Sequence, residues 1–285
     1  MTKKQKAILY IILSAFCFSL MNLFVKLSGD LPSIQKSFFR NLVAMGVAGF
    51  LLFRSNEGFH FKKENLGLLI LRSTFGTMGI LFNFYAISHL NLSDASVLNK
   101  LSPFFVIIFS YFFLKEKVTP TQVFCVITAF VGSIFIIKPS FQFEAMFPAL
   151  IGFAGGLVAG AAYTTVRALS LRGEKGAFIV FFFSSFSCLV VSPYLMFNFA
   201  PMTMNQLLCL LLAGVAASGG QFSITAAYAN APAGEISIYD YTIVIFAALW
   251  SFIFWGDIPD VMSIIGYGIV FAAAFAMFLY NKKKA

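Results

Sequence analysis

Charged residues make up only 11% of this 285-residue chain, and the acidic ones are the rarer, with 11 against 20 lysines and arginines. An average soluble domain is about a quarter charged and about half apolar. This chain is 60% apolar and contains 38 phenylalanines. A soluble fold of this length could not bury so much apolar surface. The composition therefore excludes an ordinary soluble domain and indicates a membrane protein.

Residues for metal or acid–base chemistry are also few. The two histidines, His60 and His89, lie in a loop and at a predicted helix end, and the chain has neither a His-Glu-x-x-His motif nor a serine–histidine pair at depth. Tyr239-Asp240 resembles half of an intramembrane aspartyl protease site, but no second Gly-x-Gly-Asp element supplies the paired carboxylate. We therefore expect no enzyme, no metal site and no cofactor.

The four cysteines do not form the pattern of a disulfide framework, because all of them fall inside apolar segments. We expect free thiols that act as small apolar side chains. They are Cys17, Cys125, Cys188 and Cys209.

Ten apolar segments, mostly of about 20 residues, occupy almost the whole chain and leave no stretch for a soluble domain. A helix of about that length crosses roughly 30 Å of hydrocarbon. The first segment is too long for the core of a secretory signal and lacks a small-residue cleavage site, so we predict a membrane helix there. The predicted spans are 7–28, 34–53, 66–88, 92–114, 119–137, 147–170, 176–198, 205–229, 233–255 and 259–280.

The cations mark one side of the predicted bundle. With the N-terminus inside, the inner segments contain most lysines and arginines, and the outer segments hold little beyond Lys36 and Lys138. We therefore expect a multi-pass protein of a bacterial plasma membrane with both termini cytoplasmic. The net charge of +9 then reflects topology. Nucleic-acid binding is not expected, because the cations are not gathered with stacking aromatics on a soluble face.

The second half of the chain faintly repeats the first. Ser110 falls on Ser251 at a spacing of 251 − 110 = 141 residues, and Asn99 falls on Asp240 at the same spacing. Two sets of five crossings must run in opposite directions, and duplicated inverted sets are common in alternating-access carriers. The predicted units are residues 1–140 and 141–285.

At these residues the chain resembles the drug/metabolite transporter superfamily, in its EamA-type branch of ten-helix carriers. In the second half, Val244 stands where the family has a proline and Asp257 where it usually has glutamate. The resemblance implies an all-α membrane protein with ten transmembrane helices, arranged as two inverted five-helix repeats around a central cavity that opens alternately to each side. It leaves the substrate open among amino acids, nucleosides, vitamins, sugars and other metabolites. The matching motifs are Phe38-Phe39-Arg40, Phe84-Tyr85-Ala86, Asp94-Ala95-Ser96, Leu101-Ser102-Pro103 and Leu114-Lys115-Glu116.

Ionisable side chains inside the spans are candidates for function, because each costs about 2.5–3.5 kcal/mol on insertion scales and needs a partner, a wet cavity or a purpose. Lys100 lies about 12 Å into its span, at about 1.5 Å per residue. It either lines the cavity or forms a structural pair with Asp94 or another edge group. We expect Arg40 and Arg72 to face the cavity, since a guanidinium grips carboxylate or phosphate, and Arg167 to lie near the inner surface.

Acidic groups inside the spans are rarer still. Asp240 is the only one clearly within a span, where it could bond to Arg72 or Arg167 or serve as a proton site. Asp94 and Glu235 begin helices at opposite faces, and we expect both to interact with the helix dipole as caps.

Polar side chains on otherwise apolar helices could orient a ligand, although bonds between helices are their commoner role. Pro103 is the candidate hinge or kink. Gly152, Gly156 and Gly160 recur every fourth residue and predict a close-packing stripe. The candidate substrate-binding residues are Asn22, Arg40, Arg72, Asn83, Asn99, Lys100, Tyr163, Gln221, Tyr239 and Asp240.

These features favour a secondary active transporter of a small polar metabolite, anionic or zwitterionic, such as an amino acid or its derivative. The alternative cargo is a larger aromatic, vitamin or nucleotide-like metabolite stacking on residues such as Phe84, Tyr163 and Tyr239. Lipophilic cations are not expected, because the first span lacks the glutamate of the small multidrug relatives. Since one chain holds both halves, a monomer should suffice and a subunit-built channel is not favoured. Coupling to protons or a counter-substrate stays open.

Overall fold

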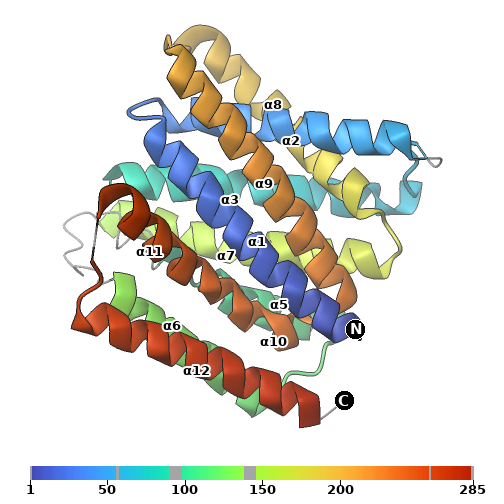
Figure 1. Cartoon of the computed structure of the whole chain (residues 1–285). Coiled ribbons are helices and arrows are strands. Elements are labelled where there is room, and N and C mark those ends of the chain that lie inside the picture. Colours follow the sequence, from blue (N-terminus) through green and yellow to red (C-terminus); the bar gives the residue numbers. More distant parts are fainter. Residues whose placement is uncertain (1, 56–57, 90–97, 138–145, 257, 284–285) are drawn as a thin grey trace.

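The computed structural model describes residues 2–55, 58–89, 98–137, 146–256 and 258–283, and all regular structure in these ranges is helical (Figure 1). The elements are α1 (Lys3–Leu27), α2 (Ser33–Arg54), η1 (Lys63–Asn65), α3 (Leu66–His89), α5 (Ser102–Leu114), α6 (Pro120–Ile137), α7 (Met146–Leu171), α8 (Gly176–Asn198), α9 (Met204–Asn230), α10 (Ala233–Ile236), η2 (Ser237–Tyr241), α11 (Thr242–Trp255) and α12 (Val261–Lys283).

The helices have the length and surface of membrane spans. Within the described ranges, nine segments are long and apolar enough to cross a bilayer, and α5 is a shorter apolar helix of 13 residues. Large apolar side chains such as Phe112, Phe197 and Phe271 point outwards and are exposed. Such a surface suits lipid tails, so the prediction of a ten-helix, all-α membrane protein is confirmed.

The first and last five helices pack mainly on one another. Helix α1 lies along α9 and contacts α11, while α7 lies along α3 and contacts α5; α2 packs on α8, and α6 on α12 (Figure 1). In the repeat, α1, α2, α3, α5 and α6 correspond to α7, α8, α9, α11 and α12. Exchanging counterparts turns the α1–α9 contact into the α7–α3 contact and the α1–α11 contact into the α7–α5 contact, and leaves the α2–α8 and α6–α12 contacts unchanged. The packing therefore has the pseudo-symmetry that the sequence repeat predicts.

The two chain ends lie at the same end of the bundle (Figure 1). The Lys4 Nζ donates to the backbone oxygen of Asn281 at 3.3 Å and pairs with a Glu235 carboxylate oxygen at 3.0 Å. Glu235 lies in the first turn of α10, so its position suits the helix dipole, and it also joins the two halves. Its predicted counterpart Asp94 is outside the described residues.

The fourth span of each half is interrupted, where the sequence predicted spans over 92–114 and 233–255 with Pro103 as the candidate hinge or kink of the first. In the first half, a turn at Lys100 and Leu101 precedes α5, and Pro103 lies in the first turn of α5. A proline there loses no helical hydrogen bond, so Pro103 starts a helix, and the break lies at Lys100 instead of Pro103. In the second half, the chain passes from α10 through η2 into α11.

The two interruptions meet. The Tyr241 hydroxyl donates to the backbone oxygen of Lys100 at 2.9 Å, and these residues are counterparts in the repeat, since 241 − 100 = 141. Counterparts that touch must lie at the pseudo-symmetry axis. Turns and short 3-10 segments at membrane depth are tolerated where protein covers them, and the Tyr241 side chain is fully buried. The second break therefore forms although Val244 replaces the expected proline.

The glycine stripe of α7 packs directly on the first of these interrupted spans. A Cβ at Gly156 would lie 2.5 Å from the backbone oxygen of Leu98, and one at Gly160 would collide with the Phe105 side chain. At Gly152 it would lie 2.8 Å from the side chain of Leu98. The close packing predicted from the sequence is confirmed.

Gly160→Ala is expected to destabilise the protein, because the new methyl must push α7 away from α5. Overpacking of this kind costs about 1–3 kcal/mol. Thermal unfolding in mild detergent measures the loss, with Gly268→Ala as the control, since a Cβ at that helical position has nothing within 4 Å. Equal melting temperatures for the two variants would contradict this account of the stripe.

Candidate functional site

Two arginines are buried side by side in the helical bundle. Arg40 on α2 is 8% exposed and Arg72 on α3 is 3% exposed, and the two guanidinium groups are close enough to repel each other electrostatically. Among the described residues, no carboxylate forms an ion pair with either of them. Both side chains are buried in the bundle, and no carboxylate of the described residues balances their positive charges.

The described contacts of the Arg72 guanidinium are with two neutral side chains. It stands 4.2 Å from the ring centroid of Phe183, and its Nη2 donates to the Gln221 Oε1 at 3.3 Å. Its Nε and Nη1 have no hydrogen-bond partner, nor has the Nε of Arg40. A buried donor without a partner is uncommon in a native structure and calls for an explanation.

Gly76, one turn after Arg72 on α3, makes room for this arrangement. A Cβ at Gly76 would collide with the Arg72 Nη1 and lie 2.7 Å from the Phe183 ring. The guanidinium therefore occupies the space that a side chain at position 76 would fill.

Gly76→Ala is expected to displace the Arg72 guanidinium and weaken ligand binding by at least about tenfold, the loss of one charged contact. Gly79→Ala is the matched control on the same helix, because its Cβ would make only an ordinary 3.5 Å contact with Val158. Ligand-induced shifts in melting temperature compare the two variants. Equal shifts would mean that the position of Arg72 does not matter for binding.

Tyr163 on α7 connects the arginines with the acidic residue of the site. It lies near Arg40, Arg72 and Asp240. Its ring also stacks on that of Tyr228, with centroids 5.7 Å apart and planes inclined by 26°. The aromatic pair thus borders both the cationic and the acidic side.

Lys100 and Asp240 form an ion pair at the two helix interruptions, with 3.6 Å between Nζ and Oδ2, and both side chains are mostly buried. The pair joins the two halves of the chain beside their pseudo-symmetry axis. Of the alternatives for Lys100, the observed partner is Asp240, while Asp94 is outside the described residues. The suggested bonds from Asp240 to Arg72 or Arg167 are wrong, because Arg72 binds Gln221 and Arg167 binds Glu116.

Six of the ten candidate residues therefore lie in one region, which we call the charge cluster. Its formal charge is +2, since three cations face one carboxylate. Both halves of the chain contribute to it. Its members are Arg40, Arg72, Lys100, Tyr163, Gln221 and Asp240.

The other four candidates have different positions. Asn22 is exposed on the stripe of α1 that faces α11, between Ser19, which accepts a hydrogen bond from Trp250, and Lys26. Asn83 is half-buried on α3, about 16 Å along the helix from Arg72 at about 1.5 Å per residue.

Asn99 and Tyr239 lie beside cluster residues in the chain. Asn99 is half-buried next to Lys100. Tyr239 is buried on η2, near Cys125 of α6, and its hydroxyl has no hydrogen-bond partner. Among the described residues, no hydrogen bond or ion pair ties either side chain to the arginines.

Sequence reasoning missed three residues that shape the cluster. Phe183 is one of 38 phenylalanines and carries no distinguishing signal in the sequence. Gly76 matters only through the space beside it. Tyr228 stacks on Tyr163, and this contact joins two helices in a way that no local pattern reveals.

A second buried network lies at the end of the bundle that contains the chain termini. Arg167 Nε and Glu116 Oε1 are 2.8 Å apart, and Arg167 Nη1 donates to the Tyr228 backbone oxygen at 2.9 Å. The other carboxylate oxygen of Glu116 accepts from the backbone N–H of Ala233 at 3.0 Å. This inner network holds the end of α5 against α7 and α10, so it connects the two halves. Arg167 lies one turn before the end of α7, and its guanidinium forms an ion pair with Glu116.

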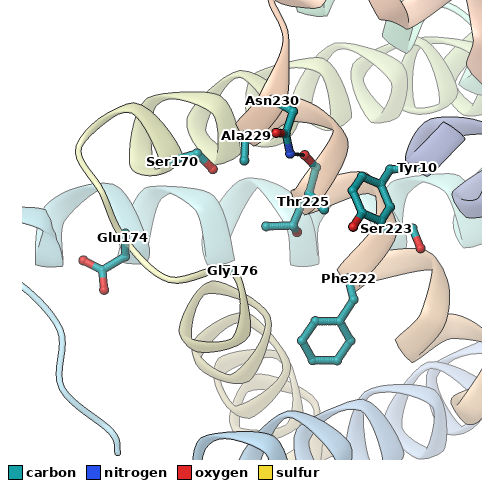
Figure 2. Close-up of a pocket in the computed structure, with 10 residues that line it drawn as sticks. Tyr10, Ser170, Glu174, Gly176, Phe222, Ser223, Thr225, Ala229 and Asn230 are labelled. Carbon is teal, nitrogen blue, oxygen red and sulfur yellow. Dashed lines mark hydrogen bonds between the residues drawn. The ribbon is translucent and has the colours of Figure 1, made fainter. Parts of the chain in front are cut away.

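A pocket of about 440 Å³ opens at the same end, between the ends of α1, α7, α8 and α9 (Figure 2). Thr225, near its centre in Figure 2, lies one helical turn after Gln221 on α9. Glu174 points away from Thr225 in that view and accepts from the Asn65 side-chain amide at 2.9 Å. The wall of the pocket therefore continues along α9 towards the charge cluster.

Several known proteins that this chain resembles are named as transporters. The model of the EamA-like transporter family matches the chain twice, over residues 5–138 and 146–279. The chain is 31% identical to the pseudopaline exporter of Pseudomonas aeruginosa over 275 residues, which cover 96% of each protein. It is 29% identical to human solute carrier family 35 member G1, over 88% of this chain and 72% of that protein. It is 27% identical to the riboflavin transporter of Brucella anthropi, over 83% and 86%.

A solved crystal structure has the same fold, with a TM-score of 0.86 over 98% of this chain and 99% of the other, at 13% identity. The names of the relatives describe transporters and not enzymes. The two matches to the family model, together with the apolar helices of the chain, show a multi-pass membrane protein built from two repeats. The chain belongs to the EamA-like transporter family.

Proposed function

We propose that the protein is a secondary active transporter that moves a small anionic or zwitterionic metabolite, such as an amino acid or its derivative, by alternating access. The observation that carries the proposal is the pair of buried guanidinium groups, Arg40 and Arg72, without a carboxylate partner in the described part of the chain. Gln221, Tyr163 and the Lys100–Asp240 pair complete the proposed binding site.

The contrast with Arg167 supports a ligand-binding role. Where this chain buries a structural arginine, it supplies a carboxylate at 2.8 Å and two backbone oxygens, at 2.9 and 3.3 Å. Arg40 and Arg72 receive no such partners from the residues that the structure describes, although each costs about 2.5–3.5 kcal/mol on insertion scales. A bound anion would balance their charge and accept from their free N–H groups.

The position of the charge cluster supports alternating access. Interrupted helices from two repeats border the binding sites of many carriers near the middle of the membrane, and here the Lys100–Asp240 pair lies at both interruptions. With both termini cytoplasmic, as the cation bias favours, the inner network would close the path to the cytoplasm and would have to separate for inward opening. Since every residue of the cluster comes from one chain, a monomer would suffice.

Asp240 is the candidate for coupling. It is the acidic member of the charge cluster, and Lys100 holds it between the two repeats. Protonation of Asp240 or a second substrate near Lys100 would change this contact, so either coupling mode would act at the same pair.

A larger aromatic or vitamin-like substrate is the second candidate. The stacked rings of Tyr163 and Tyr228 at the edge of the cluster favour it, and a riboflavin transporter is among the relatives. An aromatic ligand would add a ring to this stack, so it should lose affinity in Tyr163→Leu, whereas a small aliphatic anion should not depend on the ring.

The test is the melting temperature of the purified protein in mild detergent against a ligand panel. The panel contains amino acids, dicarboxylates, pseudopaline, riboflavin, nucleosides and lipophilic cations. A ligand at about a hundred times its dissociation constant adds about 2.7 kcal/mol of stability. We expect stabilisation by an anionic or zwitterionic metabolite. Stabilisation by lipophilic cations alone would contradict the proposal.

A further inference from the structure

Resting on the proposed function, we infer that the transported metabolite carries at least two carboxylate groups, one for each buried guanidinium. The inference concerns the substrate class of the charge cluster. It is narrower than an amino acid in general, because most amino acids carry a single carboxylate.

The charge of the cluster is the first argument. Lys100 is already matched by Asp240, which leaves Arg40 and Arg72 as two unmatched positive charges. A zwitterion of zero net charge would leave both charges unmatched inside the membrane, and a single carboxylate would leave one. A ligand with two negative charges neutralises the site without moving the Lys100–Asp240 pair, and two carboxylates on one metabolite supply one such charge for each guanidinium.

The free donors are the second argument. Arg72 has two nitrogen atoms without partners and Arg40 has at least one, on two different helices. Because Arg40 and Arg72 also repel each other, two separate acceptors stabilise them better than one shared group. Charge-assisted hydrogen bonds between guanidinium and carboxylate are about twice as strong as neutral ones.

Matched acid and amide probes test the inference. Glutamate and glutamine differ by one carboxylate at almost constant shape, as do succinate and succinamate. Apparent dissociation constants follow from melting temperatures of the purified full chain, measured at pH 7 over a range of probe concentrations. We expect each dicarboxylate to bind at least about tenfold more tightly than its amide, the loss of one charged contact.

The arginine variants make the test specific. In Arg40→Gln and in Arg72→Gln the preference for the dicarboxylate should fall to about twofold or less, because only one guanidinium remains for a carboxylate. Arg54→Gln, at the exposed end of α2, should keep the full preference. Arg40→Lys and Arg72→Lys retain the charge and should keep most of it, which covers the case in which a glutamine variant does not fold.

The outcomes separate this inference from the proposed function. Equal affinity for glutamate and glutamine overturns the two-carboxylate inference and leaves a carrier of amino acids standing. Failure of both dicarboxylates to bind overturns the inference even if another anion from the panel binds. Binding of lipophilic cations alone overturns the inference and the proposed function together.

Discussion

Replacing Arg72 with glutamine is expected to reduce ligand-induced stabilisation strongly while the ligand-free protein stays at least as stable as before. Removing one partner of a buried charged contact costs about 2–5 kcal/mol of binding, so affinity should fall by at least about 30-fold. The ligand-free protein loses a buried, incompletely hydrogen-bonded cation, whose removal from a membrane interior is favourable. Melting temperatures with and without ligand measure both effects.

The ligand-free melting temperature distinguishes binding from a structural role. A structural Arg72 would stabilise the bundle through Phe183 and Gln221, so its removal would lower the melting temperature. Arg40→Gln should behave like Arg72→Gln, and the exposed Arg54→Gln should change neither quantity. A less stable Arg72→Gln protein that binds its ligand normally would contradict the assignment.

Among the described ion pairs, the one between Glu116 and Arg167 is expected to show the largest loss of stability when it is broken, by Glu116→Gln. The Glu116 and Arg167 side chains are each 10% exposed, and breaking such a buried pair leaves an uncompensated charge at a cost of about 3–5 kcal/mol. The matched comparison is Glu235→Gln, which breaks the Lys4–Glu235 pair at the same end of the bundle. That pair is 22% and 25% exposed, so its loss should cost only about 0–1 kcal/mol.

Thermal unfolding of the two variants measures this difference. The double variant Glu116→Gln, Arg167→Gln should recover part of the lost stability, because no unpaired charge remains. If Glu116→Gln were no more destabilising than Glu235→Gln, the inner network would not be the strong contact between the halves that its geometry indicates.

Much of the fold could be predicted from the sequence, because membrane spans and repeats leave local signals. Twenty-residue apolar segments fix the number of helices, and the spacing of 141 residues relates Lys100 to Tyr241 before any contact between them is known. Because a charge in lipid is costly, the sequence also identifies Arg40, Arg72, Lys100 and Asp240 as candidate functional residues. The structure brings these four residues into one region.

The partners of the charges could not be predicted, because they depend on which helix faces which. Asp240 was expected beside Arg72 or Arg167, yet Lys100 binds it, since the interrupted spans meet at the pseudo-symmetry axis. The interruptions themselves leave no clear signal, because Pro103 lies after one break and the other has no proline at all. Phe183 could not be recognised among so many phenylalanines.

The most direct test of the central claim is charge-selective labelling of a cysteine at position 221. In a variant without the four native cysteines, Gln221→Cys places a thiol where Arg72 donates its hydrogen bond. A surplus of positive charge concentrates anions, so a sulfonate-bearing methanethiosulfonate should react at least about tenfold faster than its trimethylammonium analogue. Adding Arg72→Gln should reduce this preference, and glutamate or succinate should slow the reaction. Faster labelling by the cation, or no labelling by either reagent, would contradict an anion-binding site between the repeats.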